Sequence, residues 1–141
     1  MKTMALSSLE LCTGAGGQAI GLETAGYEHE AVVEIDHDCC ETLRLNRPNW
    51  TVLEEDIWKL KGKPFVGVDL FAAGLPCPPF SIAGQRLGLK DERNLFPAAL
   101  RLIAEIRPRA VMISEAFKLA GIVLGRKLMC CGGCSAVENR C

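Results

Sequence analysis

The fold of this chain follows from the stretch LSSLELCTGAGG, residues 6–17. Residues 6–12 are mostly apolar and predict a short strand. The glycines of GAGG predict a tight turn, because glycine accepts positive φ and lets a ligand approach the backbone closely. Residues 18–25 have the apolar spacing of a helix, which Gly26 is expected to end. Strand, glycine turn and helix in this order predict the first unit of a parallel α/β sheet.

The rest of the chain continues this alternation of strands and helices. Apolar, β-branched runs predict the strands, and spaced apolar residues predict the helices. Strands are expected at residues 31–35, 50–53, 66–73 and 109–113, and helices at 37–45 and 95–106. Such alternation implies a mainly parallel sheet covered on both faces. Right-handed crossovers make the sheet doubly wound, so the expected fold class is α/β and Rossmann-like.

Length and composition limit what the chain can be. Its 141 residues suggest one domain, and 49% of them are hydrophobic, which is enough for a buried core. The net charge of −1 is unlike that of a dedicated DNA-binding domain, so any DNA contact is expected to be local. The sequence has no secretory signal and no apolar run near the roughly 20 residues that cross a membrane. We expect a soluble, cytoplasmic protein without a membrane partner.

A small-ligand site is predicted at the carboxyl edge of the sheet, where open α/β sheets bind ligands. The glycine turn follows the first strand, Glu34 ends the second, and Asp56 follows the third. Glu34 lies 20 residues after Gly14, the spacing at which a carboxylate reaches ribose hydroxyls. Ala19 interrupts the dinucleotide pattern, which favours an adenosine compound without phosphate, namely S-adenosylmethionine, with Asp56 on the adenine amino group. The alternative is a structural turn flanked by solvated acids.

A nucleophile is predicted directly after the fourth strand. Residues 74–81, GLPCPPFS, place three prolines around one cysteine, and prolines exclude a helix or a central strand. This rigid loop would hold Cys77 at the ligand edge, where its thiolate is the reactive form. The alternative is a buried, inert cysteine, which suits Cys39 and Cys40 on a predicted helix better.

These motifs together resemble the cytosine-C5 DNA methyltransferase family. Residues 11–17, LCTGAGG, resemble its cofactor turn, and residues 34–36, EID, resemble the motif whose acid binds the ribose. Residues 56–57, DI, are similar to its adenine motif, and residues 76–81, PCPPFS, to the motif with the catalytic cysteine. Residues 91–96, DERNLF, resemble the segment after the catalytic loop.

The resemblance implies a DNA (cytosine-5-)-methyltransferase that uses S-adenosylmethionine and double-stranded DNA. The target cytosine would be flipped out of the helix, Cys77 would add to its C6, and C5 would then take the methyl group. The implied catalytic residues are Cys77 and Glu115. The implied cofactor-binding residues are Cys12, Thr13, Gly14, Gly16, Gly17, Glu34, Ile35, Asp56, Ile57, Pro76, Asn94 and Leu95. The implied DNA contacts are Ser81, Gln85 and Arg86, and no metal is expected.

The chain departs from the family after the predicted fifth strand. The family has Glu-Asn-Val there, whereas Glu115 stands one position later, and a one-residue shift in an extended segment turns a side chain to the opposite face. The tail contains Cys130, Cys131, Cys134 and Cys141, resembles nothing in the family, and lacks the second ligand pair of a zinc site. We therefore expect residues 1–113 to form the cofactor-binding and catalytic half of the domain. Residues 114–141 are expected to be a divergent tail left by truncation or a frameshift.

This division has consequences for activity and partners. The family's target-recognition region has no counterpart here, so the chain is expected to be inactive alone. The resemblance implies a bacterial enzyme acting at the nucleoid, paired with a restriction endonuclease. Two alternatives remain open at this point: a non-catalytic remnant that binds S-adenosylmethionine, and an RNA cytosine-C5 methyltransferase of the same fold.

Overall fold

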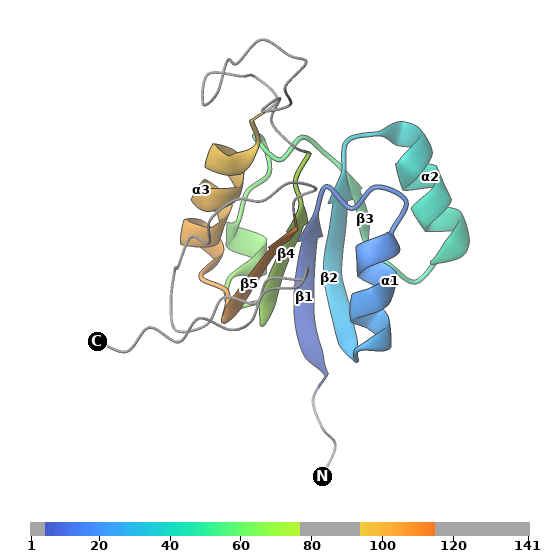
Figure 1. Ribbon diagram of the computed structural model, residues 1–141, viewed down its shortest axis with the longest axis horizontal. Helices are drawn as coiled ribbons and strands as arrows, with labels where there is room; N and C mark the ends of the chain where they lie inside the picture. Colours follow the sequence, from blue (N-terminus) through green and yellow to red (C-terminus); the bar gives the residue numbers. More distant parts are fainter. Residues whose placement is uncertain (1–4, 77–93, 115–141) are drawn as a thin grey trace.

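A computed structural model describes residues 5–76 and 94–114 of the chain. This part forms a five-stranded sheet flanked by helices (Figure 1). In chain order the elements are β1 (Leu6–Leu11), α1 (Gly17–Thr24), β2 (Tyr27–Glu34), α2 (His37–Asn46), β3 (Val52–Glu54), the 3₁₀ helix η1 (Lys63–Phe65), β4 (Leu70–Gly74), α3 (Phe96–Ile106) and β5 (Ala110–Ser114).

The sheet has the order β3-β2-β1-β4-β5, and all four pairings are parallel. The chain builds outward from β1 to β3, then returns to place β4 on the other side of β1. Leu11 is paired with both Val33 and Ala73, so the carboxyl ends of the three central strands lie level. The change of direction beside β1 creates the crevice in which such sheets bind ligands.

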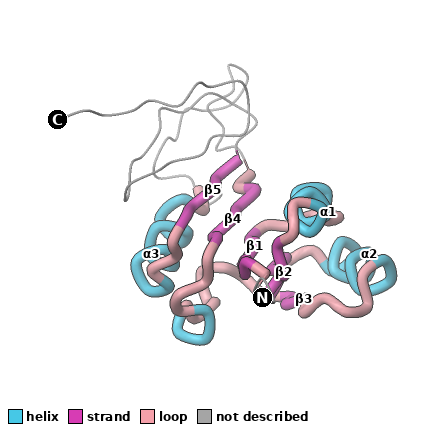
Figure 2. Tube along the Cα trace, turned by 90° about the horizontal axis from the view of Figure 1, so that it is seen from below, coloured by secondary structure: helices cyan, strands magenta, loops and turns pink. Residues whose placement is uncertain are grey.

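Helices cover both faces of the sheet, as expected for a doubly wound fold. Figure 2 shows α1 and α2 on one face and α3 on the other. The α3 helix is amphipathic because Ala98, Ala99, Leu102, Ile103 and Ile106 recur at helical spacing and are all buried. They belong to the largest core cluster of the described residues, together with Leu9, Leu11 and Phe71. In the described residues no helix combines the length and apolarity needed to cross a membrane.

The predicted elements are confirmed, with shifts at several ends. The β2 strand begins at Tyr27, four residues before the predicted start at residue 31. The prediction missed its first half because these residues carry polar side chains and alternate between exposed and half-buried positions. The β4 strand begins at Leu70 instead of residue 66. The chain before it forms η1 and then turns at Gly67, whose φ of 85° is incompatible with a strand. The prediction placed this turn in a strand because Val66 and Val68 are apolar.

Candidate functional site

A pocket of about 460 Å³ opens at the carboxyl end of the sheet. Its walls come from the segments that follow β1, β2, β3 and β4 and from the start of α3. The lining residues are Cys12, Val33, Glu34, Ile35, Glu55, Asp56, Ile57, Pro76 and Leu95. Sequence elements separated by up to 83 positions therefore meet at one site, as the strand-end argument predicted.

The glycine turn adopts the positive φ values that its sequence predicted. Gly14 and Gly16 have φ values of 57° and 96°, in the left-handed region that favours glycine. Thr13 is buried, and both its backbone N–H and its hydroxyl donate to the carbonyl oxygen of Val33, which fixes the turn to β2. A Cβ on Gly16 would lie 2.7 Å from Cδ2 of Leu43 on α2. The turn therefore lies directly against the neighbouring helix.

We expect Gly16→Ala to lower the free energy of unfolding by about 1–2 kcal/mol, because an L-residue resists positive φ and its Cβ would displace Leu43. Urea unfolding of the two proteins measures the change. Gly17→Ala is the matched control. A Cβ there meets nothing within 4 Å, and alanine favours the first turn of α1, so its effect should be neutral or stabilising. Equal losses in both variants would contradict the argument.

Glu34 is held in place by three backbone amides. Its Oε2 accepts from the N–H of Gly14 at 2.7 Å, and its Oε1 accepts from Ile35 and Asp36 at 2.8 and 3.0 Å. One carboxylate thus ties the glycine turn after β1 to the segment after β2. Oε1 uses both of its lone pairs for Ile35 and Asp36, but Oε2 keeps one, so the side chain can accept a ligand hydroxyl without giving up these contacts.

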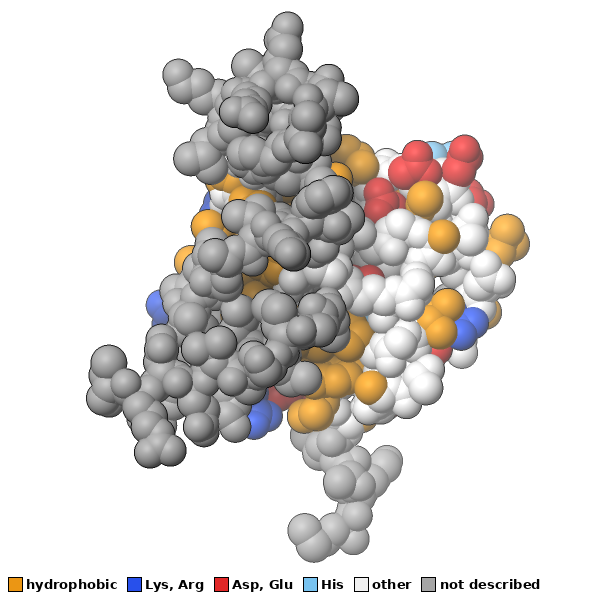
Figure 3. All heavy atoms as spheres, viewed as in Figure 1, with side chains coloured by type: hydrophobic (Ala, Val, Ile, Leu, Met, Phe, Trp, Pro, Cys, Tyr) orange, Lys and Arg blue, Asp and Glu red, His pale blue; other side chains and the backbone are white. Residues whose placement is uncertain are grey.

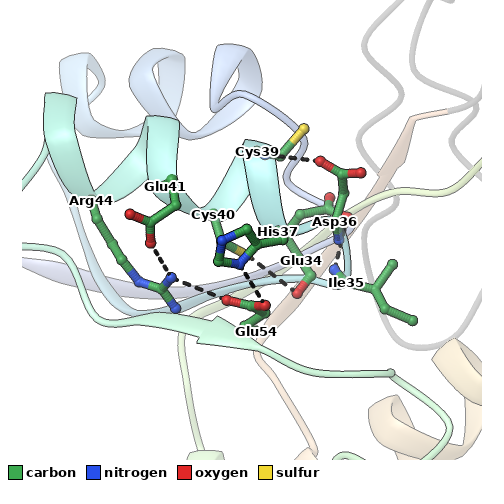
Figure 4. Close-up of polar contacts among 9 residues, drawn as sticks. All are labelled: Glu34, Ile35, Asp36, His37, Cys39, Cys40, Glu41, Arg44 and Glu54. Atoms are coloured by element: carbon green, nitrogen blue, oxygen red, sulfur yellow. Dashed lines mark hydrogen bonds and ion pairs between the residues drawn. The ribbon is translucent and has the colours of Figure 1, made fainter.

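Hydrogen bonds connect the polar side chains beside Glu34, at the edge of the pocket (Figure 4). Asp36 accepts from the N–H of Cys39 and caps the start of α2. His37 Nδ1 lies 3.0 Å from Glu54 Oε1, and Arg44 donates to the other oxygen of Glu54 at 3.1 Å. The pKa of His37 is raised by its hydrogen bond to Glu54. These exposed contacts join α2 to the end of β3 and contribute little individually.

The third strand end supplies the next wall of the pocket. The N–H of Glu55 donates to the Glu34 carbonyl at 2.9 Å, which extends the pairing of β2 and β3 by one residue. Asp56 follows, and its Oδ1 accepts from the N–H of Trp58 at 2.9 Å, leaving Oδ2 for another donor. Ile57 is buried and presents an apolar surface to the same pocket.

The described cysteines are poor nucleophiles. Burial, and then the nearby Glu34 carboxylate, raises the pKa of Cys12 to about 11. The pKa of Cys39 is raised by its hydrogen bond to Asp36, and that of Cys40 by burial. All three thiols stay protonated at neutral pH, and only thiolates are strong nucleophiles. Cys12 therefore lines the pocket as a small apolar group.

The structure brings seven of the predicted cofactor residues together as lining of the pocket: Cys12, Glu34, Ile35, Asp56, Ile57, Pro76 and Leu95. Thr13, Gly14, Gly16 and Gly17 build the turn beside it. Asn94 is buried, and its Oδ1 accepts from the N–H of Phe96 at 3.2 Å, so it supports the start of α3. Sequence reasoning missed Val33 and Glu55, which strand-end position alone could have indicated.

The predicted reactive and DNA-contacting residues lie outside the described part of the chain. These are Cys77, Ser81, Gln85, Arg86 and Glu115, and the four tail cysteines lie outside it as well. Their described neighbours are placed: Pro76 lines the pocket, and Ser114 ends β5 opposite Gly74. Within residues 5–76 and 94–114, no cluster of three or more His, Cys, Asp or Glu side chains could hold a metal ion.

Among the described residues, the lining of the pocket carries charge of one sign. Three of these nine lining residues are acidic, and none of the nine is basic. Figure 3 shows acidic side chains and a histidine gathered at the upper right, over the start of α2 in the same view. An electronegative pocket favours a cationic ligand and disfavours phosphates.

Comparison with known proteins agrees with this geometry. The sheet superposes on a crystal structure of a DNMT2 triple mutant from Spodoptera frugiperda with a TM-score of 0.58 and 26% identity, over 72% of this chain and 32% of that one. The fold is therefore the Rossmann-like methyltransferase fold. The family model of C-5 cytosine-specific DNA methylases matches residues 6–115, and the chain belongs to that family.

Two bacterial relatives show how much of a family member is present. The chain is 56% identical over 112 residues to the Type II methyltransferase M.NgoMIV of Neisseria gonorrhoeae, covering 79% of this chain and 36% of that protein. It is 46% identical over 113 residues to the Type II methyltransferase M.NaeI of Lentzea aerocolonigenes, covering 78% of this chain and 27% of that protein. The chain thus spans about a third of the length of these relatives.

Proposed function

We propose that this chain is the cofactor-binding and catalytic part, residues 1–113, of a DNA (cytosine-5-)-methyltransferase. It would bind S-adenosylmethionine in the pocket and attack a flipped cytosine with Cys77. The observation that carries the proposal is the convergence of the glycine turn, Glu34 and Asp56 on one pocket whose wall includes Pro76, the residue before Cys77.

The residues present fit S-adenosylmethionine. Glu34 Oε2 offers a free lone pair for a ribose hydroxyl, and Asp56 Oδ2 can accept from the amino group of adenine. Val33, Ile35, Ile57 and Leu95 supply an apolar surface for the base. The acidic lining suits a ligand that carries a sulfonium cation and no phosphate.

The chemistry then assigns separate roles to the chain's own residues. Bound S-adenosylmethionine would supply the methyl group. The thiolate of Cys77 forms a bond to C6 of the flipped cytosine, and the electron pair displaced to C5 makes that carbon the nucleophile for methyl transfer. Loss of the C5 proton to a base re-forms the C5–C6 double bond and expels the thiolate. Glu115 is the proposed partner of the cytosine ring, and Ser81, Gln85 and Arg86 are proposed DNA contacts.

The expected surroundings follow from the relatives, which are Type II methyltransferases of bacteria. We propose double-stranded DNA as the substrate and the bacterial nucleoid as the place of action. A restriction endonuclease of the same specificity is the proposed partner. Because the chain spans about a third of these relatives, we propose that the chain alone does not methylate DNA. The family match ends at residue 115, which supports the proposal that residues 114–141 are a divergent tail.

The proposal is tested by trapping. Residues 6–113 would replace the matching segment of M.NgoMIV, and the chimera would be incubated with S-adenosylmethionine and duplex DNA containing 5-fluorocytosine, which blocks loss of the C5 substituent. A covalent protein–DNA adduct is expected, and Cys77→Ser should abolish it. A chimera that binds S-adenosylhomocysteine but gives no adduct, or an adduct that persists in Cys77→Ser, would overturn the assignment.

A further inference from the structure

Arg101, on the polar face of α3, holds the turn that follows β3. One guanidinium nitrogen donates to three backbone carbonyl oxygens, those of Ile57 at 2.9 Å, Trp58 at 3.3 Å and Leu60 at 3.1 Å. These residues lie 41 to 44 positions earlier in the chain. A single side chain thus gathers the carbonyls of one turn and fixes it to α3.

Glu105, one helical turn further along α3, completes this clamp. Its Oε1 accepts from Arg101 at 2.7 Å, and its Oε2 accepts from the N–H of Gly62 at 2.8 Å. The pKa of Glu105 is lowered, first by the Gly62 amide and then by Arg101. A Cβ on Gly62 would lie 2.7 Å from Cβ of Glu105, so the segment lies directly against the helix. Arg101 and Glu105 therefore fix both ends of residues 57–62.

The clamped turn is the one that orients Asp56. The carbonyl of Asp56 accepts from Lys59 at 2.8 Å and from Leu60 at 3.1 Å, while its Oδ1 accepts from Trp58. The backbone and one carboxylate oxygen of Asp56 are thus committed to the turn. The direction of the remaining oxygen, Oδ2, follows from the position of residues 57–60.

We propose that Arg101 is a positioning residue that sets the base selectivity of the pocket, by holding the turn that aims Asp56 Oδ2 at the exocyclic amino group of adenine. The inference rests on the proposed function, because it requires an adenosine ligand. Arginine suits this role because its planar guanidinium carries five donors in a fixed fork, whereas lysine is a point charge on a flexible stem. The contact with Glu105 alone would matter little, since exposed ion pairs are weak.

The test compares two ligands that differ only at the base. Binding of S-adenosylhomocysteine and S-inosylhomocysteine to the 141-residue chain would be measured by calorimetry for the parent protein and for Arg101→Lys. Inosine presents an oxygen where adenine presents the amino group. The parent should prefer adenine by about tenfold or more, the range of a hydrogen bond to a charged group. Arg101→Lys should lose most of that preference.

Arg47→Lys is the matched control. Arg47 has a similar exposure, 35% against 36% for Arg101, but bonds to Glu23 away from the pocket. A purely structural role of Arg101 would weaken both ligands equally and leave their ratio unchanged. Amide hydrogen exchange without ligand gives a second measurement, in which Arg101→Lys should speed exchange at Trp58, Lys59 and Leu60 and Arg47→Lys should not.

The outcomes separate the two proposals. If the parent chain binds neither ligand, the proposed cofactor site fails and the inference fails with it. If the parent binds with a preference for adenine and Arg101→Lys keeps that preference, the inference alone is overturned. Loss of the preference in Arg101→Lys, with the control unchanged, supports it.

Discussion

Glu10→Gln is expected to remove most of the pH dependence of stability between about pH 4.5 and pH 8. Glu10 is fully buried in the central strand β1, and neither of its carboxylate oxygens has a hydrogen-bond partner among the described residues. Burial raises its pKa from 4.5 to about 8, and the nearby backbone amide of Ala19, which forms no well-aligned hydrogen bond to the carboxylate, offsets only part of the shift. The folded chain therefore keeps this proton at neutral pH.

The direction of the effect follows from proton linkage. Between the unfolded and folded pKa values the folded state binds one more proton than the unfolded state, so the free energy of unfolding falls as pH rises. The slope is about 1.4 kcal/mol per pH unit, which amounts to several kcal/mol over this window. Glutamine cannot ionise and lacks this slope. The stability that the parent chain loses over this window is a large share of the roughly 5–15 kcal/mol that stabilises a typical domain.

Urea unfolding at pH 5, 6.5 and 8 would measure the effect. The parent chain should weaken steadily over this range, and Glu10→Gln should stay nearly constant. Glu28→Gln is the control, because Glu28 is exposed on the neighbouring strand β2. Parallel pH profiles for the parent and Glu10→Gln would show that Glu10 does not carry this proton.

The fold and the position of the pocket could be predicted from the sequence, because the residues at the strand ends show which side chains meet at one edge of the sheet. Hydrophobic runs located the strands, and parallel strands bring their carboxyl ends to one edge. Glu34 and Asp56 were therefore expected at one edge of the sheet, and both line the pocket, while their roles toward a cofactor stay predictions. The glycines at positions 14 and 16 predicted positive φ, because few other residues tolerate it, and both residues have it.

The environment of Glu10 could not be predicted in this way. A half-buried strand would turn a polar residue at this position toward water, but β1 lies at the centre of the sheet and helices cover both faces. Both faces of β1 are therefore buried, including Ser8 and Glu10. The sequence predicted helices on both faces of the sheet, but the residues of this strand alone do not show that β1 lies at its centre, where a polar side chain on either face is buried.

The contacts of Arg101 and Glu105 could not be predicted from the sequence for a different reason. On α3 they occupy the polar face at a spacing of four, which is typical of an exposed ion pair. Their main contacts are to backbone groups of residues 57–62, and backbone carbonyls have no sequence signature. Only the packing of α3 against the turn after β3 shows that these side chains bond to the turn that follows the pocket residue Asp56.

Glu34→Gln is expected to weaken S-adenosylmethionine binding by about 100-fold, since charge-assisted hydrogen bonds are worth more than neutral ones. Glutamine has one acceptor oxygen where glutamate has two. Its NH₂ group must therefore face either the N–H of Gly14 or those of Ile35 and Asp36, all of which are donors. The variant would lose the proposed ribose contact and would also release either the glycine turn or the segment after β2.

Glu55→Gln is the control that measures the effect of removing one negative charge from the pocket without releasing the amides that Glu34 holds. Glu55 lines the same pocket, but its side chain holds none of the three amides, so its neutralisation should cost only a fewfold loss of affinity. Calorimetric titration of the 141-residue chain with S-adenosylmethionine at low and high salt would compare the two variants. The loss in Glu55→Gln should shrink at high salt, whereas that in Glu34→Gln should persist, because salt screens charge but does not restore a missing acceptor. Equal, salt-sensitive losses would mean that Glu34 acts only through its charge and that its bridge between the two strand ends does not shape the site.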